Sequence, residues 1–320
     1  MRALTFLAIV VLAAGCDDGT MMGTDSGPPV DAAPRRLCPT DGVPSPDELM
    51  GPCCWRVDQT TQSEAPEARL NYLEITEPIG SPLASMTLRR VLNESMQDES
   101  FNWLFRVDGA AADGAVTVVT GFGRRNTDGT YSFSGGSADG DPDTWCPASL
   151  PATLAGESVA SEELEGALTV PVFDDAGVML QVELVLRALT IREANWTESR
   201  SCIGAKTNRP FTYTPGAELA AFIEVEPSRT QMINVPPVIT TVCAAVAGAL
   251  DDATYCDTVA QGEWMIPPDS LCDATGCMQN TTGMTDVCDP ASTDPGGCNA
   301  WHLVAGFAAA GVDIDNGVCP

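Results

Sequence analysis

Apolar and polar residues alternate in several stretches of the central part of the chain. Mostly apolar residues occupy every second position over residues 101–107, 116–122, 164–172 and 178–186. Alternation of this kind predicts β-strands with one buried face. Short turns rather than regular helices separate these stretches, which favours antiparallel pairing. We therefore expect residues 38–235 to form a mainly β domain, an antiparallel β-sandwich.

Three local features refine this strand pattern. Pro171 interrupts one predicted strand, so this strand should lie at a sheet edge or contain a bulge. After Arg187 the apolar residues shift to the opposite phase, which predicts an irregularity near that point. Residues 81–96 instead begin with a Ser-Pro pair and then carry apolar residues at every fourth position, which predicts a helix.

The pattern changes again after residue 235. Val238, Val242, Val246 and Leu250 recur at helical spacing, and residues 301–308 are predicted to form a last helix. The same region contains seven cysteines in a background rich in Gly, Thr, Asp and Pro. Disulfides stabilise such small regions by restricting the unfolded chain. We expect residues 236–320 to form a small, disulfide-rich helical module.

The N-terminal segment has the pattern of a secretory signal peptide. Arg2 precedes an apolar run over residues 4–12, and this run is too short to span a membrane as a helix. Residues 12–16, Leu-Ala-Ala-Gly-Cys, then resemble the lipobox of bacterial lipoproteins. They depart from the usual lipobox at Ala13, where that family commonly has Leu.

This resemblance implies removal of residues 1–15 and attachment of a diacylglycerol to Cys16. Residues 16–37 are small, polar and proline-rich, and they predict a flexible tether because they cannot bury enough apolar area to become ordered. We therefore expect a protein anchored by its lipid to the inner or the outer membrane of the cell envelope, with its folded part outside the cytoplasm. The alternative is ordinary secretion with Cys16 left as a free thiol.

The number of cysteines agrees with lipidation. The chain has 13 cysteines, and an odd number would leave one free thiol in an oxidising compartment. With Cys16 lipidated, all of the others can pair. The predicted disulfide cysteines are Cys38, Cys53, Cys54, Cys146, Cys202, Cys243, Cys256, Cys272, Cys277, Cys288, Cys298 and Cys319.

The strongly negative charge of the chain argues against negatively charged partners. There are 44 acidic and 16 basic residues, which gives a net charge of −28. Such a surface repels nucleic-acid phosphates and anionic lipid headgroups, so we expect no nucleic-acid binding. Contact with the membrane is expected through the lipid anchor, and a protein or a glycan is the expected kind of ligand.

The sequence has a single histidine and none of the common catalytic motifs. His302 is the one histidine, so any Ser-His-Asp or Cys-His site would have to be built on it. We interpret His302 as a structural residue of the predicted last helix. Nucleophile-elbow, His-Glu-x-x-His and phosphate-loop motifs do not occur. We expect a non-catalytic surface, adhesion or binding component.

Paired carboxylates offer an alternative that needs no histidine. Glycosidases use two Asp or Glu residues. The candidate acids on or beside predicted strands are Glu74, Asp108, Glu163, Glu165 and Glu183. Two acids facing each other across an aromatic cleft would favour an envelope hydrolase of this kind, whereas scattered outward acids would favour a binding protein. The six tryptophans also leave a carbohydrate-binding protein open.

Calcium is the one cofactor that the sequence suggests. Asp139, Asp141 and Asp143 alternate as at the start of an EF-hand loop, but the glycine and the final glutamate of that loop are missing. Asp313 and Asp315 form a shorter match. Solvated acidic turns are the alternative for both segments, and no other cofactor is expected.

Overall fold

The structure is a computed structural model that describes most of the chain from residue 64 onward. The predicted leader, the tether and five cysteines lie outside the described residues: Cys16, Cys38, Cys53, Cys54 and Cys319. The described ranges are 64–82, 86–97, 99–137, 140–141, 143–173, 180–197, 200, 202–206, 213–235, 238–259, 263–280, 287–290 and 297–315.

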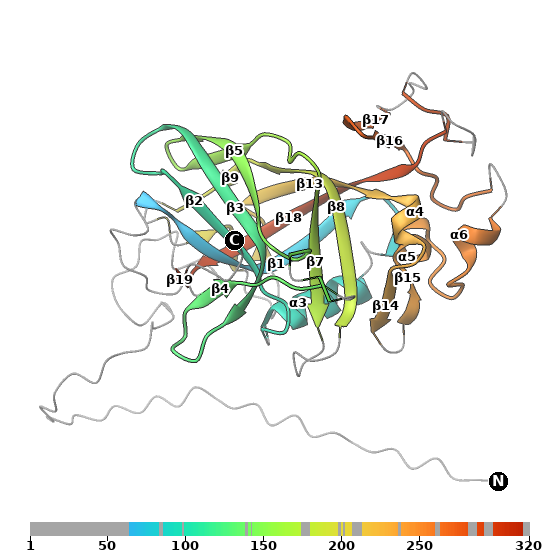
Figure 1. Ribbon diagram of the computed structural model, residues 1–320, viewed down its shortest axis with the longest axis horizontal. Helices are drawn as coiled ribbons and strands as arrows, with labels where there is room; N and C mark the ends of the chain where they lie inside the picture. Colours follow the sequence, from blue (N-terminus) through green and yellow to red (C-terminus); the bar gives the residue numbers. More distant parts are fainter. Residues whose placement is uncertain are drawn as a thin grey trace, which may run out of the picture. The chain divides into compact units, whose positions relative to one another are not determined.

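The described strands form one 15-stranded sheet and two small two-stranded sheets (Figure 1). Neighbouring strands of the main path, in order, are β7 (Ala167–Phe173), β8 (Leu180–Arg192), β13 (Ala217–Glu224), β18 (Ala300–Gly311), β1 (Glu67–Glu77), β2 (Trp103–Asp108), β3 (Gly114–Arg125), β5 (Ala148–Ala155), β6 (Ser158–Ser161) and β9 (Ala194–Asn195).

The remaining elements are short, apart from one helix. The other strands of the large sheet are β4 (Tyr131–Phe133), β10 (Cys202–Ile203), β16 (Ser270–Asp273), β17 (Gly276–Gln279) and β19 (Ile314–Asp315). The small sheets pair β11 (Ala205–Lys206) with β12 (Tyr213–Thr214), and β14 (Met232–Val235) with β15 (Val238–Thr241). The helices are α3 (Met86–Gln97), α4 (Val225–Ser228), α5 (Val242–Ala247) and α6 (Tyr255–Thr258).

The large sheet curls until its two ends meet. β9 follows β8 after a single residue, Glu193, and pairs with β6 at the far end of the strand order. A hydrogen bond from the Ile191 N–H to Ser161 Oγ also joins β8 to β6. The prediction of a mainly β, antiparallel fold is confirmed. The pairings of the described strands join one curled sheet rather than two separate sheets, so the predicted sandwich is not confirmed.

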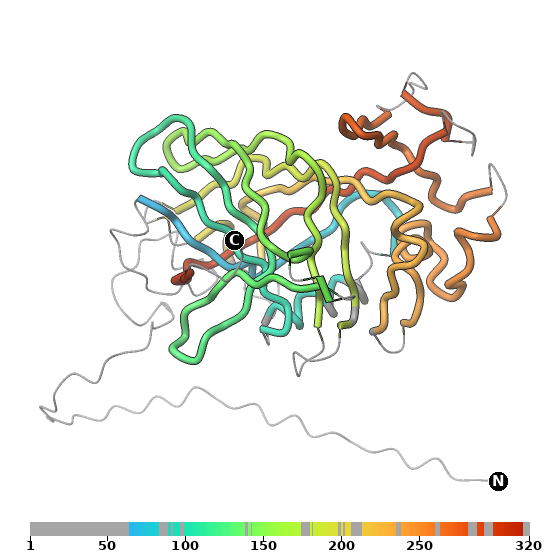
Figure 2. Tube along the Cα trace, in the orientation of Figure 1, coloured from blue at the N-terminus to red at the C-terminus, as the bar shows by residue number. Residues whose placement is uncertain are grey.

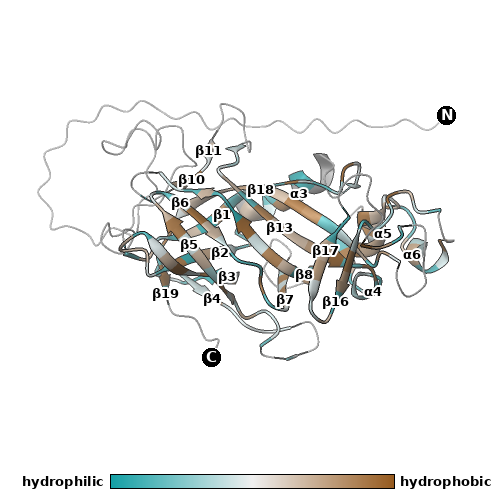
Figure 3. Cartoon of the chain, turned by 90° about the horizontal axis from the view of Figure 1, so that it is seen from above, coloured by the Kyte–Doolittle hydropathy of each residue, from teal (hydrophilic) through white to brown (hydrophobic). Residues whose placement is uncertain are grey.

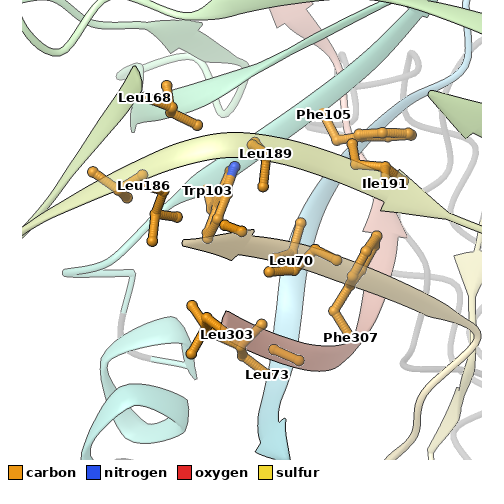
Figure 4. Close-up of a cluster of buried hydrophobic side chains, with 14 of the residues drawn as sticks. Leu70, Leu73, Trp103, Phe105, Leu168, Leu186, Leu189, Ile191, Leu303 and Phe307 are labelled. Carbon is orange, nitrogen blue, oxygen red and sulfur yellow. The ribbon is translucent and has the colours of Figure 1, made fainter. Parts of the chain in front are cut away.

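The inner face of the curled sheet holds a large apolar core. Leu70 of β1, Phe105 of β2, Ile191 of β8 and Phe307 of β18 approach one another there (Figure 4). The aromatic face predicted for residues 101–107 lies in this core, as predicted, while Leu104 on the opposite face is buried in a second, smaller apolar cluster. Brown hydrophobic bands and paler or teal bands follow one another along the strands in Figure 3.

The prediction of a last helix over residues 301–308 is wrong, because these residues lie in β18. This strand pairs with β1 on one side and with β13 on the other, and in Figure 2 it lies beside β1 although the two are far apart in sequence. Trp301, Leu303 and Phe307 all belong to the core. The alanine-rich segment has helical propensity, but pairing along both edges overrides it. The predicted division at residue 235 therefore runs through the sheet.

Other local predictions are confirmed. β7, which contains Pro171, is an end strand of the sheet. The irregularity expected after Arg187 is a bulge, where Ala188 has a φ of 51° and the pairing of β8 with β13 shifts register. A helix also forms where one was predicted, although α3 begins at Met86 rather than at the Ser-Pro pair and ends at Gln97. Its Asn93 docks on β1 by bonding to both the N–H and the carbonyl of Leu73, each at 2.9 Å.

The helix predicted from the spacing of Val238 to Leu250 forms only in part. Residues 238–241 pair with β14 as strand β15, and α5 begins after them. Thr241 caps this helix, because its Oγ1 accepts the Ala244 N–H at 3.1 Å. Gly248 ends it with a φ of 99°, a conformation that glycine adopts readily. Within the described part of the chain, none of the helices has the length and apolar character needed to cross a membrane.

Candidate functional site

The described cysteines are all in disulfides. Three bridges have both partners described: Cys243–Cys256, Cys272–Cys277 and Cys288–Cys298. Cys146 and Cys202 are also disulfide-bonded. Among the residues that the structure describes, no cysteine is therefore a free thiol, and none is offered as a nucleophile or a metal ligand.

The predicted calcium residues lie in two separate segments, and Asp315 belongs to strand β19. Asp141 Oδ1 accepts the Asp143 N–H at 2.9 Å, while Asp139 lies outside the described residues. Asp315 Oδ2 accepts a hydrogen bond from Thr130 Oγ1 at 2.7 Å, and the Asp313 carbonyl accepts one from a backbone N–H of β4. Within the described ranges, no group of three or more His, Cys, Asp or Glu side chains is placed to hold a metal ion.

His302 lies on β18, on the face opposite the core. Its side chain is 7% exposed, and its Nδ1 is 2.9 Å from Glu77 Oε2. The ring of Phe222, on the neighbouring strand β13, lies 5.1 Å from the imidazole. Among the described residues, no hydroxyl or thiol hydrogen-bonds to the imidazole, so the pair resembles a buried structural contact more than a nucleophile with its base.

A cavity of about 390 Å³ lies beside the turn between β16 and β17. Three segments line it: residues 163–166 before β7, Arg187 and Ala188 of β8, and the turn 274–276 between β16 and β17. The volume falls within the range of small-molecule sites. Two of the acids that the sequence suggested, Glu163 and Glu165, line this cavity. No aromatic residue lines it in the part of the chain that the structure describes.

The remaining strand acids are engaged elsewhere. Glu183 accepts a hydrogen bond from Trp145 Nε1 at 2.6 Å. Glu74 forms an ion pair with Arg89 of α3. Asp108 forms an ion pair with Arg106. The structure therefore brings together two of the five carboxylates considered from the sequence and leaves the other three apart.

The wall made by the β16–β17 hairpin is fixed by local chemistry. The Cys272–Cys277 disulfide joins two directly opposite residues of the hairpin. At the turn, Asp273 Oδ1 accepts hydrogen bonds from the Thr275 N–H at 2.7 Å and from Thr275 Oγ1 at 2.6 Å. These bonds, together with the nearby Gly276 N–H and Arg187, hold the pKa of Asp273 below its ordinary value. The conformation of this turn is therefore fixed by contacts within the protein and needs no ligand.

A small apolar cluster holds the hairpin against the sheet. Its members come from β8, β13, β16, β17 and β18: Ala188, Phe222, Cys272, Cys277 and Ala300. The cavity is therefore formed by segments about 110 residues apart in the sequence. The sequence predicted the irregularity near Ala188 and showed the close spacing of Cys272 and Cys277. It did not indicate that these two segments lie side by side in the folded protein.

Among the described residues, Arg187 is the one basic residue that lines the cavity. Its Nη1 lies 3.1 Å from Glu224 Oε2, and its Nη2 donates to the Asp273 carbonyl at 3.0 Å. Its Nε is buried and has no hydrogen-bond partner among the described residues. Because Glu224 neutralises this guanidinium, Glu163 and Glu165 leave the cavity with a net negative charge.

No protein-family model, no curated protein and no solved structure matches this chain. Function is therefore inferred from the residues and their arrangement.

Proposed function

We propose that this chain is a lipid-anchored, extracytoplasmic protein of the bacterial cell envelope that binds a ligand or partner and has no catalytic activity. The observation that carries the proposal is the state of the cysteines. Every described cysteine is in a disulfide, and stable structural disulfides are typical of exported proteins. The lipobox-like residues 12–16 supply the route of export and the anchor.

The arrangement of the cavity supports binding over glycoside hydrolysis. Glycosidases place two carboxylates on either side of a bound sugar. Glu163 and Glu165 instead come from one short segment on the same wall, and both residues are exposed. None of the described residues that line the cavity is aromatic, so these residues provide no surface on which a sugar ring could stack. A carboxylate-dependent envelope hydrolase remains the second candidate, because two carboxylates do share the cavity.

Replacing Cys16 with alanine is expected to release the protein from the membrane. The acyl chains attached at Cys16 would provide the attachment, and each buried methylene contributes about 0.8 kcal/mol. Membrane fractionation and labelling with radioactive palmitate check this: the wild-type chain should be labelled and sediment with membranes, whereas Cys16→Ala should be unlabelled. Cys319→Ala is the matched control, because it removes a cysteine without touching the lipobox. Equal membrane association of wild type and Cys16→Ala would contradict the proposal.

A further inference from the structure

The segment after β18 packs on the face of β2 that is opposite the large core. We call residues 312–315 the covering segment. Its Ile314 lies opposite Tyr131 in the parallel pairing of β19 with β4, and the Tyr131 N–H donates to the Asp313 carbonyl at 2.8 Å. Two residues of the covering segment and four of β2, β3 and β4 form one apolar cluster: Val312, Ile314, Leu104, Val119, Tyr131 and Phe133.

Glu67, the first residue of β1, binds the covering segment at two points. Its carbonyl accepts the Val312 N–H at 3.2 Å, and its Oε2 accepts the Ile314 N–H at 2.7 Å. Glu67 is only 7% exposed, so this carboxyl is buried where the covering segment meets the sheet. A third bond, from Thr130 Oγ1 to Asp315 Oδ2 at 2.7 Å, holds the end of the covering segment.

The surroundings of the Glu67 carboxyl disfavour its ionised form. Arg106 lies directly opposite Glu67 on β2, but its guanidinium binds both oxygens of Asp108, at 2.8 and 3.2 Å. Asp313 adds a negative charge from the covering segment. Burial raises the pKa of Glu67 to about 7, although the Ile314 N–H and Arg106 act in the opposite direction.

Two further titratable side chains lie on the strands around this site. Arg69, two residues after Glu67 on β1, donates to the Met96 carbonyl and to Asn102 Oδ1. Tyr131 of β4 donates to a glutamate carboxylate at 3.2 Å, and burial raises its pKa above the ordinary value. The arginine stays protonated and the tyrosine stays neutral between about pH 5 and pH 8, so neither offsets the titration of Glu67.

We propose that Glu67 makes the covering segment sensitive to pH: residues 312–315 stay on the sheet while this carboxyl is protonated, and they open locally and expose the apolar cluster as it ionises. Opening brings water to the carboxylate and removes the cost of holding a charge in a buried site. The protonated carboxyl has no such cost. The open state is therefore favoured as the pH rises and the closed state as it falls.

Hydrogen exchange of the full chain between pH 5 and pH 8, followed by mass spectrometry with residue resolution, tests this proposal. Dividing each rate by the intrinsic rate at the same pH removes the direct effect of pH on exchange. In wild type, protection of the Val312 and Ile314 amides should fall about 70-fold over this range, if the pKa of Glu67 is about 7 when closed and 4.5 when open. In Glu67→Gln it should change by less than about threefold, because glutamine accepts the same N–H but does not ionise.

Asp315→Asn is the matched control, because it removes a charge from the covering segment while asparagine can still accept the Thr130 hydroxyl. It should alter protection by a similar factor at every pH and keep the pH dependence of wild type. The amides of β18, which is paired on both edges, report global unfolding and should stay better protected than that of Ile314 throughout.

Four outcomes would overturn the proposal. They are protection of Ile314 that does not fall in wild type, an equal fall in Glu67→Gln, loss of the pH dependence in Asp315→Asn, and protection of Ile314 equal to that of β18. Thermal melts confirm that each variant is folded. Membrane fractionation of Cys16→Ala is independent of these measurements, so this inference and the proposed anchor are tested separately.

Discussion

Replacing Glu67 with glutamine is expected to remove a pH dependence of about 3 kcal/mol from the free energy of unfolding. Burial raises the pKa of Glu67 from 4.5 to about 7, with further increases from Asp313 and Asp108. The Ile314 N–H, which donates to Glu67 Oε2 at 2.7 Å, and Arg106 oppose this rise. Each pKa unit corresponds to about 1.4 kcal/mol of differential stability.

The sign follows from which form the folded protein prefers. The folded state holds the Glu67 proton up to about pH 7, whereas the unfolded state releases it near pH 4.5. The stability contributed by the neutral carboxyl is fully present below pH 4.5 and is lost as the pH rises through 7. Relative to wild type, Glu67→Gln should therefore gain about 3 kcal/mol between pH 4.5 and pH 8.

Urea denaturation of wild type and variant at a series of pH values measures this difference directly. Subtracting the free energy of unfolding of wild type from that of Glu67→Gln at each pH cancels the contributions of all other titrating groups that the substitution does not affect. Glu162→Gln, at an exposed position, is the control for loss of one carboxyl. A difference between wild type and Glu67→Gln that stays constant from pH 4.5 to pH 8 would show that the Glu67 carboxyl is not desolvated in the folded protein.

Replacing Trp301 with alanine is expected to lower the free energy of unfolding by about 3–5 kcal/mol, the cost of emptying a large buried site. Trp301, a residue of β18, has no exposed surface, and its side chain lies in the core. Its Nε1 donates to the Ile266 carbonyl at 3.1 Å, and its ring meets Trp264 edge-on at 5.7 Å. Truncation would remove the ring contacts and leave that carbonyl without its donor.

Trp264→Ala is the matched control, because Trp264 is only partly buried and packs against the edge of the core. It should destabilise the protein by less than half as much in the same denaturation experiment. A loss below about 1 kcal/mol for Trp301→Ala would contradict the central position of β18, since a surface substitution usually changes stability by about 0.5 kcal/mol or less.

Much of the sheet could be predicted because its information is local. The alternation around Trp103 identifies the face of β2 that lies in the large core. Pro171 restricts its strand to an edge because it has no N–H to donate to a second neighbouring strand. The change of phase after Arg187 corresponds to a bulge that the backbone of Ala188 makes. Each of these predictions depends on only a few residues that are adjacent in the sequence.

The last strand could not be predicted in this way. Trp301, Leu303 and Phe307 fit a strand, but the intervening and following alanines fit a helix equally well. Pairing with β1 and β13 decides between them, and these partners lie about 230 and 80 residues earlier. The spacing of the cysteines did identify the region as rich in disulfides, which is confirmed.

Only part of the candidate site could be predicted, because the site also depends on contacts between residues that are distant in the sequence. Glu163 and Glu165 drew notice because they are acids beside a predicted strand. The role of Arg187 and of the turn 274–276 depends on the hairpin β16–β17 folding back onto the sheet, through contacts of Phe222 with the disulfide Cys272–Cys277. A local pattern does not contain contacts over such sequence distances.

Mass spectrometry of the native protein tests the central claim most directly. After alkylation without reduction and digestion, the account predicts an N-terminal peptide that begins at Cys16 and carries a diacylglycerol, and no alkylated cysteine elsewhere in the chain. Reduction before alkylation should then reveal the paired cysteines, including both partners of Cys243–Cys256. An intact leader with an unmodified Cys16, or widespread alkylation without reduction, would contradict it.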